Sequence, residues 1–528
     1  MSPEAVAVCA LFLCAFAAVL AGIPVAFALS GAALAVAGVA DLVGLFDLAF
    51  LGAIPSRIFG TAMFNEVLTA VPLFILMGVV LERSRIAEDL LTKMAVLFGG
   101  LRGGLGISVT LVGTLLAAST GIVAATVVAM GLLSLPAMLK RGYDRPLACG
   151  VICASGTLGQ IIPPSIVLVF LGDQLSGAYM EAQREVGNYA PDPLSVGDLF
   201  AGALIPGLLL AGGYVLYLVT MAALKPETCP PIPLAERRER VSPAELVRTL
   251  VAPIVLVVSV LGSILTGIAT PTEAAGIGAL GAILLASLRL AADGGDPRGG
   301  RVVLAGFAAV ALLPLLRLAG DLRLGRDDAT TTDTVLIAVA MVALTVAAAA
   351  TLTAAVMLAR RGVLRPAFES TMRLCALAFS ILIGATIFSL VFRGLGGDDL
   401  VLALMEDIPG GVHGAVLAVM AVVFLLGFFL DFIEIVFIVM PIVAPVILRS
   451  DIDPVWFGVL LAINLQTSFL TPPFGFSLFY LRGVAPPEIT TGHIYRGVAP
   501  FIVIQLGVLA LVGFWPQVAT WLPHWIYG

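Results

Sequence analysis

Two long apolar segments of this chain are each interrupted near the middle by a pair of prolines. The first carries G-Q-I-I-P-P-S (Gly159 to Ser165), and the second, about three hundred residues later, carries T-S-F-L-T-P-P-F-G (Thr467 to Gly475). Proline lacks a backbone N–H and clashes with the preceding turn, so we expect the helices to break at Pro163–Pro164 and Pro472–Pro473. Freed backbone groups at bilayer depth are tolerated only inside protein or beside a polar cavity. Two interrupted segments at matching places therefore predict the binding site of a secondary transporter.

The composition places these segments in a membrane. Of the 528 residues, 60% are hydrophobic and 12% are charged, and the mean hydropathy is +1.10. Repeated apolar runs of about 20 residues, the length of a membrane-spanning helix, predict an all-α polytopic membrane protein. No basic stretch is interleaved with aromatic residues, so we expect no nucleic-acid partner. The N-terminus lacks the positive region of a cleaved signal peptide, and residues 6–20 are expected to be a retained helix.

The apolar runs predict single spans and two helical hairpins. The hairpins are expected at 105–138 and 412–447, and the proline-broken spans at 146–172 and 455–481. The other expected spans are 5–21, 24–44, 66–82, 199–222, 249–268, 272–290, 302–319, 334–358, 374–392 and 498–518.

The placement of Lys and Arg orients these spans, because basic loops are cytoplasmic. The basic loops are Arg83–Arg102, Lys140–Arg145, Arg237–Arg240, Arg298–Arg301 and Arg360–Arg365. The loops between them are acidic or mixed. The exceptions are Arg323, Arg326, Arg393 and Arg449, each with acidic residues nearby. The first hairpin then enters from inside and the second from outside, so the two halves form inverted repeats.

This layout predicts the domain organisation. The transport domain is expected to consist of 105–172 and 412–481, each a re-entrant hairpin followed by a broken helix. Scaffold helices are expected at 1–104, at 173–290 together with a polar cytoplasmic linker, and at 374–411. The interval 291–373 has no counterpart in the first half and predicts an inserted helix pair, and 482–528 predicts a C-terminal helix. The linker at 223–246 is compatible with an amphipathic helix on the membrane surface.

Polar residues gather at the two expected hairpin tips. The first tip contains Ser119, Thr120 and Gly121, whose hydroxyls either belong to a site or cap the following helix. The second contains Gly427 and Asp431; a carboxylate in such apolar surroundings costs about 2.5–3.5 kcal/mol on insertion scales. Asp431 is expected either to face a cation or another compensating group, or to be the N-cap of the second arm. Glu434 either shares that site or faces solvent.

A second set of polar residues precedes each proline pair. Hydroxyl and unwound carbonyl oxygens suit a hard monovalent cation such as Na⁺, and the half-helix N-termini that follow the prolines suit an anionic substrate group. The polar residues are Ser155, Gly156, Thr157, Gln160, Asn464, Gln466, Thr467, Ser468 and Thr471. The candidate substrate-binding residues among and beside them are Gln160, Pro163, Pro164, Ser165, Asn464, Gln466, Pro472 and Pro473.

Missing motifs exclude other classes of protein. No G-x-x-x-x-G-K-[ST] phosphate loop occurs, so ATP is not expected to drive this chain directly. The six cysteines and three histidines show no metal-ligand spacing; Cys149 and Cys153, four apart, are expected to be packing residues. We expect no cofactor. Neither G-x-S-x-G nor H-E-x-x-H is present, which argues against an intramembrane enzyme.

Five segments in order carry a family resemblance: G-I-P-V-A-F-A-L (Gly22 to Leu29), V-P-L-F-I-L-M-G (Val71 to Gly78), I-I-P-P-S (Ile161 to Ser165), T-P-T-E-A-A (Thr270 to Ala275) and F-L-T-P-P-F-G (Phe469 to Gly475). Over nearly its full length the chain resembles the large membrane subunit of tripartite ATP-independent periplasmic (TRAP) transporters. The insertion 291–373 departs from the commoner form and resembles the long subgroup named for mannitol or chloroaromatic compounds.

The resemblance implies a Na⁺-coupled elevator in the bacterial inner membrane that imports an organic acid anion. It implies a small membrane subunit and a periplasmic solute-binding protein as partners. It also implies ion sites between tips and breaks, at Ser119–Gly121 with Ser155–Thr157, and at Gly427–Asp431 with Thr467, Ser468 and Thr471. Glu273, in T-P-T-E-A-A, is expected to satisfy a helix N-terminus. The alternative is a stand-alone Na⁺- or H⁺-coupled dicarboxylate or ion symporter with similar inverted hairpins.

Overall fold

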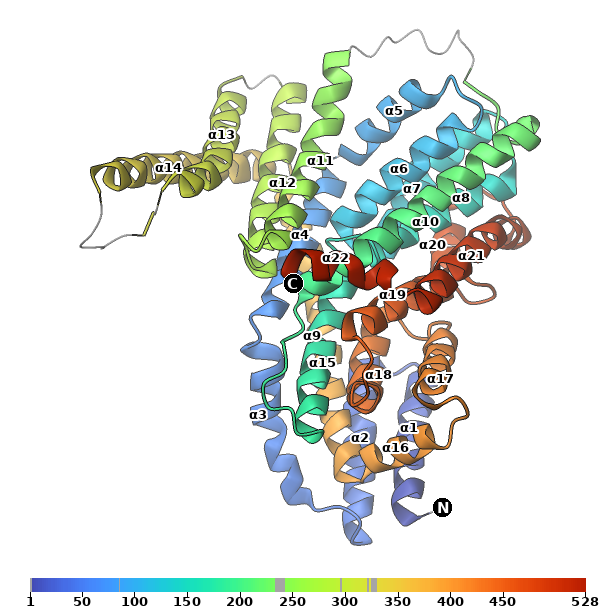
Figure 1. The fold of residues 1–528 in the computed structure, drawn as a ribbon. Coiled ribbons are helices and arrows are strands. Elements are labelled where there is room, and N and C mark those ends of the chain that lie inside the picture. Colours follow the sequence, from blue (N-terminus) through green and yellow to red (C-terminus); the bar gives the residue numbers. More distant parts are fainter. Residues whose placement is uncertain (1, 85, 233–242, 295–296, 321, 324–329) are drawn as a thin grey trace.

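The computed structural model describes residues 2–84, 86–232, 243–294, 297–320, 322–323 and 330–528, without the side chains at 87, 119–120, 243–250, 292–294 and 314. All regular secondary structure in these ranges is helical (Figure 1). Nine helices within the described ranges are long and apolar enough to cross a bilayer, or up to eleven if two bent pairs are counted as spans. The protein is therefore the expected all-α polytopic membrane protein.

The first half contains α1 (Pro3–Leu20), α2 (Val25–Leu42), α3 (Ile54–Ile58), α4 (Ala70–Arg83), α5 (Ile86–Phe98), α6 (Gly104–Thr120), α7 (Val123–Lys140), α8 (Arg145–Thr157), α9 (Ile166–Glu185), α10 (Val196–Leu224) and α11 (Pro243–Leu265). The second half contains α12 (Pro271–Gly294), α13 (Pro297–Ala319), α14 (Thr331–Arg360), α15 (Leu364–Gly394), α16 (Gly397–Glu406), α17 (Gly411–Leu426), α18 (Phe432–Ile447), α19 (Pro454–Leu470), α20 (Phe476–Val484), α21 (Thr491–Phe514) and α22 (Gln517–Tyr527). Short 3₁₀ or π turns lie at Leu48–Ala53, Phe59–Met63, Val67–Thr69, Leu158–Gln160 and Pro226–Thr228.

The expected hairpins and breaks form as paired units. Helices α6 and α7 are the arms of the first hairpin, and α8 and α9 are the halves of the first broken helix. Helices α17 and α18 form the second hairpin, and α19 and α20 the second broken helix. We call α6–α9 the first unit and α17–α20 the second unit, and residues 161–165 and 471–475 the first and second breaks.

The two units exchange contacts in the same way. Helix α9, which follows the first break, packs on α18, the second arm of the other unit's hairpin. Helix α20, which follows the second break, packs on α7, the second arm of the first unit's hairpin. The rings of Phe170 and Phe437 meet edge to face with centroids 4.9 Å apart at the first of these contacts. This reciprocal packing is what two repeats related by a pseudo-twofold axis produce.

Helices α10 and α21 complete the two units. Each follows the broken helix of its own half, and each packs against the other half: α21 lies along α8, and α10 contacts α19. Outside this core, α2 packs on α15 and α4 packs on α12. At the N-terminus, Phe12 of α1 packs edge to face on Phe388 and Phe392 of α15, with centroids 5.3 and 5.9 Å apart.

The interval expected to hold an inserted pair contains α13 and α14. They pack on each other and on α12, and Figure 1 shows α14 extending away from the core. Small side chains at Ala343, Ala347, Ala350 and Ala354 are buried along this contact. Gly306 allows the close approach, since a methyl group there would meet the Ala350 Cβ at 2.2 Å. Small residues in this spacing are how membrane helices approach closely.

Two arginines that break the positive-inside pattern are neutralised by acidic partners. Arg393 at the end of α15 forms an ion pair with Glu181 of α9, and its Nε lies 3.8 Å from Asp398 Oδ2. Arg449 forms an ion pair with Glu185. These pairs explain how basic residues occur in loops that are otherwise acidic. Arg326 lies outside the described residues, and so do residues 233–242 of the linker 223–246, in which an amphipathic helix is expected.

Helices that hydropathy does not predict are short or carry charge. They are α3, α5, α16 and α22. In addition, α9 continues to Glu185, past the expected end at 172, because its polar residues have partners in the fold. Asn65 donates a hydrogen bond from Nδ2 to Asp173 Oδ1 (2.5 Å), which joins α9 to the bend before α4.

Candidate functional site

The first break is enclosed on all sides. Helix α8 ends at Thr157, a 3₁₀ turn runs over Leu158–Gln160, and α9 begins at Ile166. Every residue from Ile161 to Phe170 is buried. Ser165 Oγ donates a hydrogen bond to the Gln160 carbonyl (2.9 Å), which bridges the break and satisfies one carbonyl that the prolines leave without a donor. The Pro163–Pro164 peptide bond is cis.

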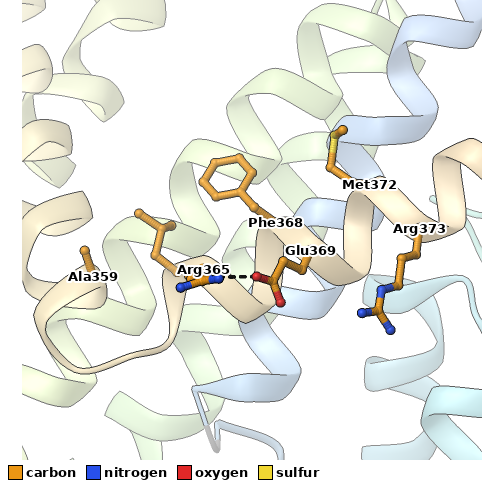
Figure 2. A pocket seen from close by; sticks show the side chains of 7 residues that line it. Ala359, Arg365, Phe368, Glu369, Met372 and Arg373 are labelled. Atoms are coloured by element: carbon orange, nitrogen blue, oxygen red, sulfur yellow. Dashed lines mark hydrogen bonds and ion pairs between the residues drawn. The ribbon is translucent and has the colours of Figure 1, made fainter.

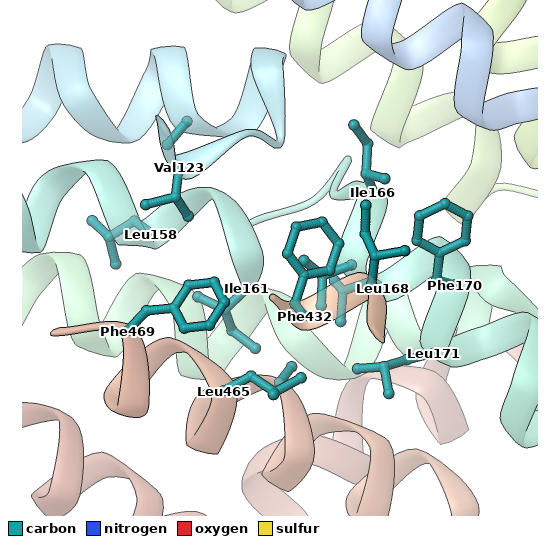
Figure 3. Close-up of a cluster of buried hydrophobic side chains, with 14 of the residues drawn as sticks. Val123, Leu158, Ile161, Ile166, Leu168, Phe170, Leu171, Phe432, Leu465 and Phe469 are labelled. Carbon is teal, nitrogen blue, oxygen red and sulfur yellow. The ribbon is translucent and has the colours of Figure 1, made fainter. Parts of the chain in front are cut away.

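Apolar side chains from both units close around the first break. Figure 3 shows Val123 of α7, Leu158, Ile161 and Ile166 together with Phe432, Leu465 and Phe469 of the second unit. The hairpin tip completes this enclosure, because Gly121 has φ 61° and a methyl group there would lie 3.0 Å from the Ile166 side chain. Ser119 and Thr120 end α6, and their side chains lie outside the described part of the chain.

The hydroxyls predicted for the first site lie on α8, against the hairpin arms. Ser155 Oγ donates to the Val151 carbonyl (2.6 Å), and Thr157 Oγ1 donates to the Ala154 carbonyl (2.9 Å). Ser155 faces α6, since a methyl group on Gly113 would meet its Cβ at 2.6 Å; at Gly156 a methyl group would meet Val127 of α7 at 2.3 Å. The structure thus brings Ser155 and Gly156 against the two arms of the first hairpin, and a cation site with the tip stays a prediction.

The second break differs in exposure. Helix α19 ends at Leu470 and α20 begins at Phe476. Pro473 and Phe474 are exposed, and Thr471 and Pro472 are half-buried. Ser477 Oγ donates across the break to the Phe469 carbonyl (2.7 Å), and Tyr495 of α21 donates to the Pro473 carbonyl (2.8 Å). The Pro472–Pro473 bond is also cis.

The second hairpin tip lies against the predicted residues of α19. A methyl group on Gly427 would lie 2.1 Å from Ser468 Oγ, so only glycine fits between tip and helix. Asn464 Nδ2 donates to the Met420 carbonyl of α17 (2.8 Å). Thr467 Oγ1 donates to the Ile463 carbonyl (2.7 Å), and Thr471 Oγ1 donates to the Thr467 carbonyl (2.7 Å).

Asp431 is the N-cap of α18. Its Oδ1 accepts a hydrogen bond from the Phe432 N–H (2.7 Å), and the Asp431 N–H donates to Glu434 Oε2 (3.1 Å). The structure therefore contains the capping arrangement that was the alternative to a ligand role, and it assigns Glu434 to the same cap. The Asp431 side chain is half-buried, and a carboxylate at a helix N-terminus is stabilised by the helix dipole. Glu273 caps α12 in the same way, with its Oε2 accepting from the Thr270 N–H (2.9 Å).

Two residues that sequence reasoning missed lie beside the predicted set. Gln505 Nε2 of α21 donates to the Tyr214 hydroxyl of α10 (2.8 Å) and lies 3.4 Å from Thr157 Oγ1. Gln466 Nε2 lies 3.5 Å from the same tyrosine hydroxyl. All four side chains are buried. A single glutamine in the apolar run F-I-V-I-Q-L-G was the signal available in the sequence.

A surface hollow lies away from the breaks. It has a volume of about 670 Å³ and lies where α14 turns into α15. Figure 2 shows residues that line it, with Arg365 paired to Glu369 and with Phe368 and Met372 on the same helix, α15. Among the described residues no group of three or more His, Cys, Asp or Glu side chains is arranged to hold a metal ion. The atoms at the two breaks that could bind a cation are hydroxyl, amide and carbonyl oxygens.

Comparisons with known proteins assign this chain to a family. The sequence model of the family described as "Tripartite ATP-independent periplasmic transporter, DctM component" matches residues 9–360 and 297–518. This chain belongs to the TRAP transporter DctM family. The resemblance inferred from the five sequence segments is therefore confirmed, while the mannitol or chloroaromatic subgroup stays a prediction.

Two relatives show how far the similarity extends. The C4-dicarboxylate TRAP transporter large permease protein DctM of Vibrio cholerae is 27% identical, over 99% of this chain and 98% of its own length. The sialic acid TRAP transporter large permease protein SiaM of the same organism is 26% identical, over 96% of each chain. Both are named as transporter permeases, which sets the intramembrane-enzyme alternative aside.

A solved structure shares the fold of this TRAP permease. The YdaH transporter of Alcanivorax borkumensis superposes with a TM-score of 0.54 and covers 89% of each chain at 16% identity. At that identity the likeness concerns the fold alone.

Proposed function

We propose that this chain is the large permease of a Na⁺-coupled, binding-protein-dependent transporter that imports small organic acid anions by an elevator motion. The observation that carries the proposal is the pairing of two inverted units, each with a hairpin packed against a polar segment before a proline break. Such paired breaks are where secondary transporters bind ion and substrate.

The hydroxyl groups before the breaks are prepared to bind a cation. Ser155, Thr157, Thr467, Ser468 and Thr471 each donate their hydroxyl proton to a carbonyl of their own helix. Their remaining lone pairs can only accept, and a Na⁺ ion is the partner that needs several such oxygens. The first cation would lie among the first-unit residues with the Ser119–Gly121 tip, and the second among Thr467, Ser468 and Thr471 with the Gly427–Asp431 tip.

The helices after the breaks are suited to an anion. The N-cap residues of α9 and α20, Ser165 and Gly475, provide no side-chain hydrogen bond to the first turn of either helix. Ser165 instead uses its hydroxyl to bridge the break. The first N–H groups and the positive ends of both helix dipoles therefore support a carboxylate between Pro163–Ser165 and Pro472–Pro473. Gln160, whose side-chain amide is fully buried without a hydrogen-bond partner in the described structure, together with Asn464 and Gln466, completes the proposed substrate set.

Similar proteins support an acid as the substrate. The two relatives described above are named for C4-dicarboxylates and for sialic acid, which are organic acids. The family description names a tripartite periplasmic system, of which this chain is one component. We therefore propose a small membrane subunit and a periplasmic solute-binding protein as partners, and the bacterial inner membrane as the location.

Reconstitution tests the proposed function directly. The permease and small subunit, placed in proteoliposomes with an inward Na⁺ gradient, are expected to accumulate a radiolabelled C4-dicarboxylate or another acid that the binding protein retains. Uptake should require the binding protein and should stop when choline replaces Na⁺. Uptake of equal rate without the binding protein would contradict the proposal and support a stand-alone symporter. Uptake that does not respond to Na⁺ would refute sodium coupling.

A further inference from the structure

A buried polar network joins four helices at the centre of the molecule. Tyr214 of α10 accepts a hydrogen bond from Gln505 of α21 (2.8 Å), and Gln466 of α19 lies within 3.5 Å of the same hydroxyl. Gln505 also reaches Thr157 of α8 at 3.4 Å. None of the four side chains is exposed to solvent (each 0% exposed). The network therefore contacts both broken helices just before their breaks.

The network follows the internal symmetry of the fold. Thr157 and Gln466 hold equivalent positions, each six residues before the first proline of its pair. Tyr214 and Gln505 lie on α10 and α21, the helices that follow the first and second broken helices. Each repeat thus contributes one residue before its break and one residue from its next helix. The hydrogen bonds run between the repeats, because Gln505 binds Thr157 and Gln466 binds Tyr214.

Two amide oxygens in this network have no partner among the described residues. They are Gln466 Oε1 and Gln505 Oε1, and both are fully buried. The ring of Phe501 packs edge to face on Tyr214 at a centroid distance of 5.1 Å. Buried amide oxygens normally receive hydrogen bonds from protein or from ordered water, and a polar enclosure with several acceptors is where buried water is found. Helix packing alone would not need these groups, since small and apolar side chains suffice for it.

We propose that Tyr214 and Gln505 are positioning residues that hold α8 and α19 together. The network fixes the two half-helices that carry the polar residues before the breaks, so that both breaks move as one body. Tyr214 and Gln505 act on the transport site through Thr157 and Gln466 and do not themselves contact the transported solute. Its role in transport rests on the proposed function; its role in holding the helices does not.

Tyr214→Phe is the test, and Tyr217→Phe is its matched control. Both tyrosines lie on α10, and both rings pack edge to face on Phe501 with centroids 5.1 Å apart. Tyr214 alone of the two has a hydroxyl that is hydrogen-bonded within the described structure. The phenylalanine variant keeps the packing of the ring and removes only the group that both glutamines share, so folding is expected to be retained.

Hydrogen–deuterium exchange of the purified permease complex measures how strongly the network stabilises α8 and α19. Tyr214→Phe is expected to raise the exchange rate of peptides from both α8 and α19 at least fivefold, and Tyr217→Phe is expected to leave them unchanged. Because Tyr214 and Gln505 act as one unit, the double variant with Gln505→Leu should exchange no faster than the faster single variant. Unchanged exchange in α8 and α19, or additive effects of the two substitutions, would contradict the proposal that Tyr214 and Gln505 stabilise these helices as one unit.

Uptake in proteoliposomes then measures the consequence for transport. With binding protein and Na⁺ saturating, Tyr214→Phe is expected to lower the maximal rate at least threefold while the half-saturating solute concentration stays the same. A wild-type rate in a variant whose exchange has increased would overturn the positioning role. If the wild-type complex shows no uptake, the proposed function has failed, and the exchange experiment still decides whether the network holds the helices.

Discussion

The two units have the same backbone plan but different surroundings. The first break is buried from Ile161 to Phe170, whereas Pro473 and Phe474 of the second break are exposed. The second hairpin tip carries a carboxylate, Asp431, at the start of α18; in the first hairpin the equivalent N-cap of α7 is Ile122. The pseudo-symmetric frame therefore holds one buried break beside a hairpin tip capped by Ile122, and one exposed break beside a tip that carries a carboxylate.

This difference indicates what each unit contributes. A repeat fixes where the backbone breaks, but side chains decide whether solvent reaches the break and which charge faces it. The ring of Phe474 pairs with that of Phe429 at the second tip, with centroids 5.6 Å apart, and both rings are exposed. In the proposed transport cycle, such asymmetry is expected of one end state, in which one of the two sides is accessible.

The largest expected effect concerns accessibility. Ile162 is 7% exposed and Phe474 is 45% exposed. In a background without the exposed thiols of Cys9 and Cys14, Phe474→Cys is expected to react with a charged methanethiosulfonate at least a hundredfold faster than Ile162→Cys. Mass spectrometry of the labelled complex at timed intervals gives both rates. Equal rates at the two positions would remove the distinction between a closed and an open unit.

The second effect concerns the charge at the second tip. If Asp431 faces a cation as well as capping α18, Asp431→Asn should raise the half-saturating Na⁺ concentration for uptake on the order of tenfold, or about 1.4 kcal/mol. Asparagine caps helices as well as aspartate, so the helix start is preserved.

Asp453→Asn is the control for this second effect. Asp453 is the N-cap of α19, with Oδ1 accepting from the Val455 and Trp456 N–H groups (2.8 and 3.1 Å). It should leave the Na⁺ titration unchanged. If both variants titrate like the wild type, Asp431 is a cap only and the two units do not differ in ion binding.

The smallest effect concerns the hydrogen bonds at the breaks. Ser165→Ala leaves the buried Gln160 carbonyl without the donor that bridges the first break, and the expected loss of unfolding free energy is about 1 kcal/mol. Tyr495→Phe removes the hydrogen bond to Pro473, which water can replace at the exposed second break, and the expected loss is a few tenths of that value. Unfolding in mixed micelles measures both. A larger loss for Tyr495→Phe would show that the second break is not open to solvent.

Much of the site was predictable because its signals are local in the chain. The Pro-Pro pairs fix where α8 and α19 must end, since proline removes a donor wherever it stands. The residues before each pair, from Ser155 to Thr157 and from Thr467 to Thr471, then lie at the break whatever the rest of the fold does. Asp431 as the N-cap of α18 was one of its two expected roles, whereas the part of Glu434 in that cap was not expected.

The sequence by itself determined the helical spans, the two hairpins, the two breaks and the polar residues beside them. Each depends on hydropathy, on proline or on spacing within one segment. Tertiary structure alone decided that α9 packs on α18 and α20 on α7, that Tyr214 and Gln505 meet Thr157 and Gln466, and that one break is buried while the other is exposed. Those features depend on contacts between residues hundreds of positions apart, and a glutamine in an apolar run does not show which hydroxyl it will reach.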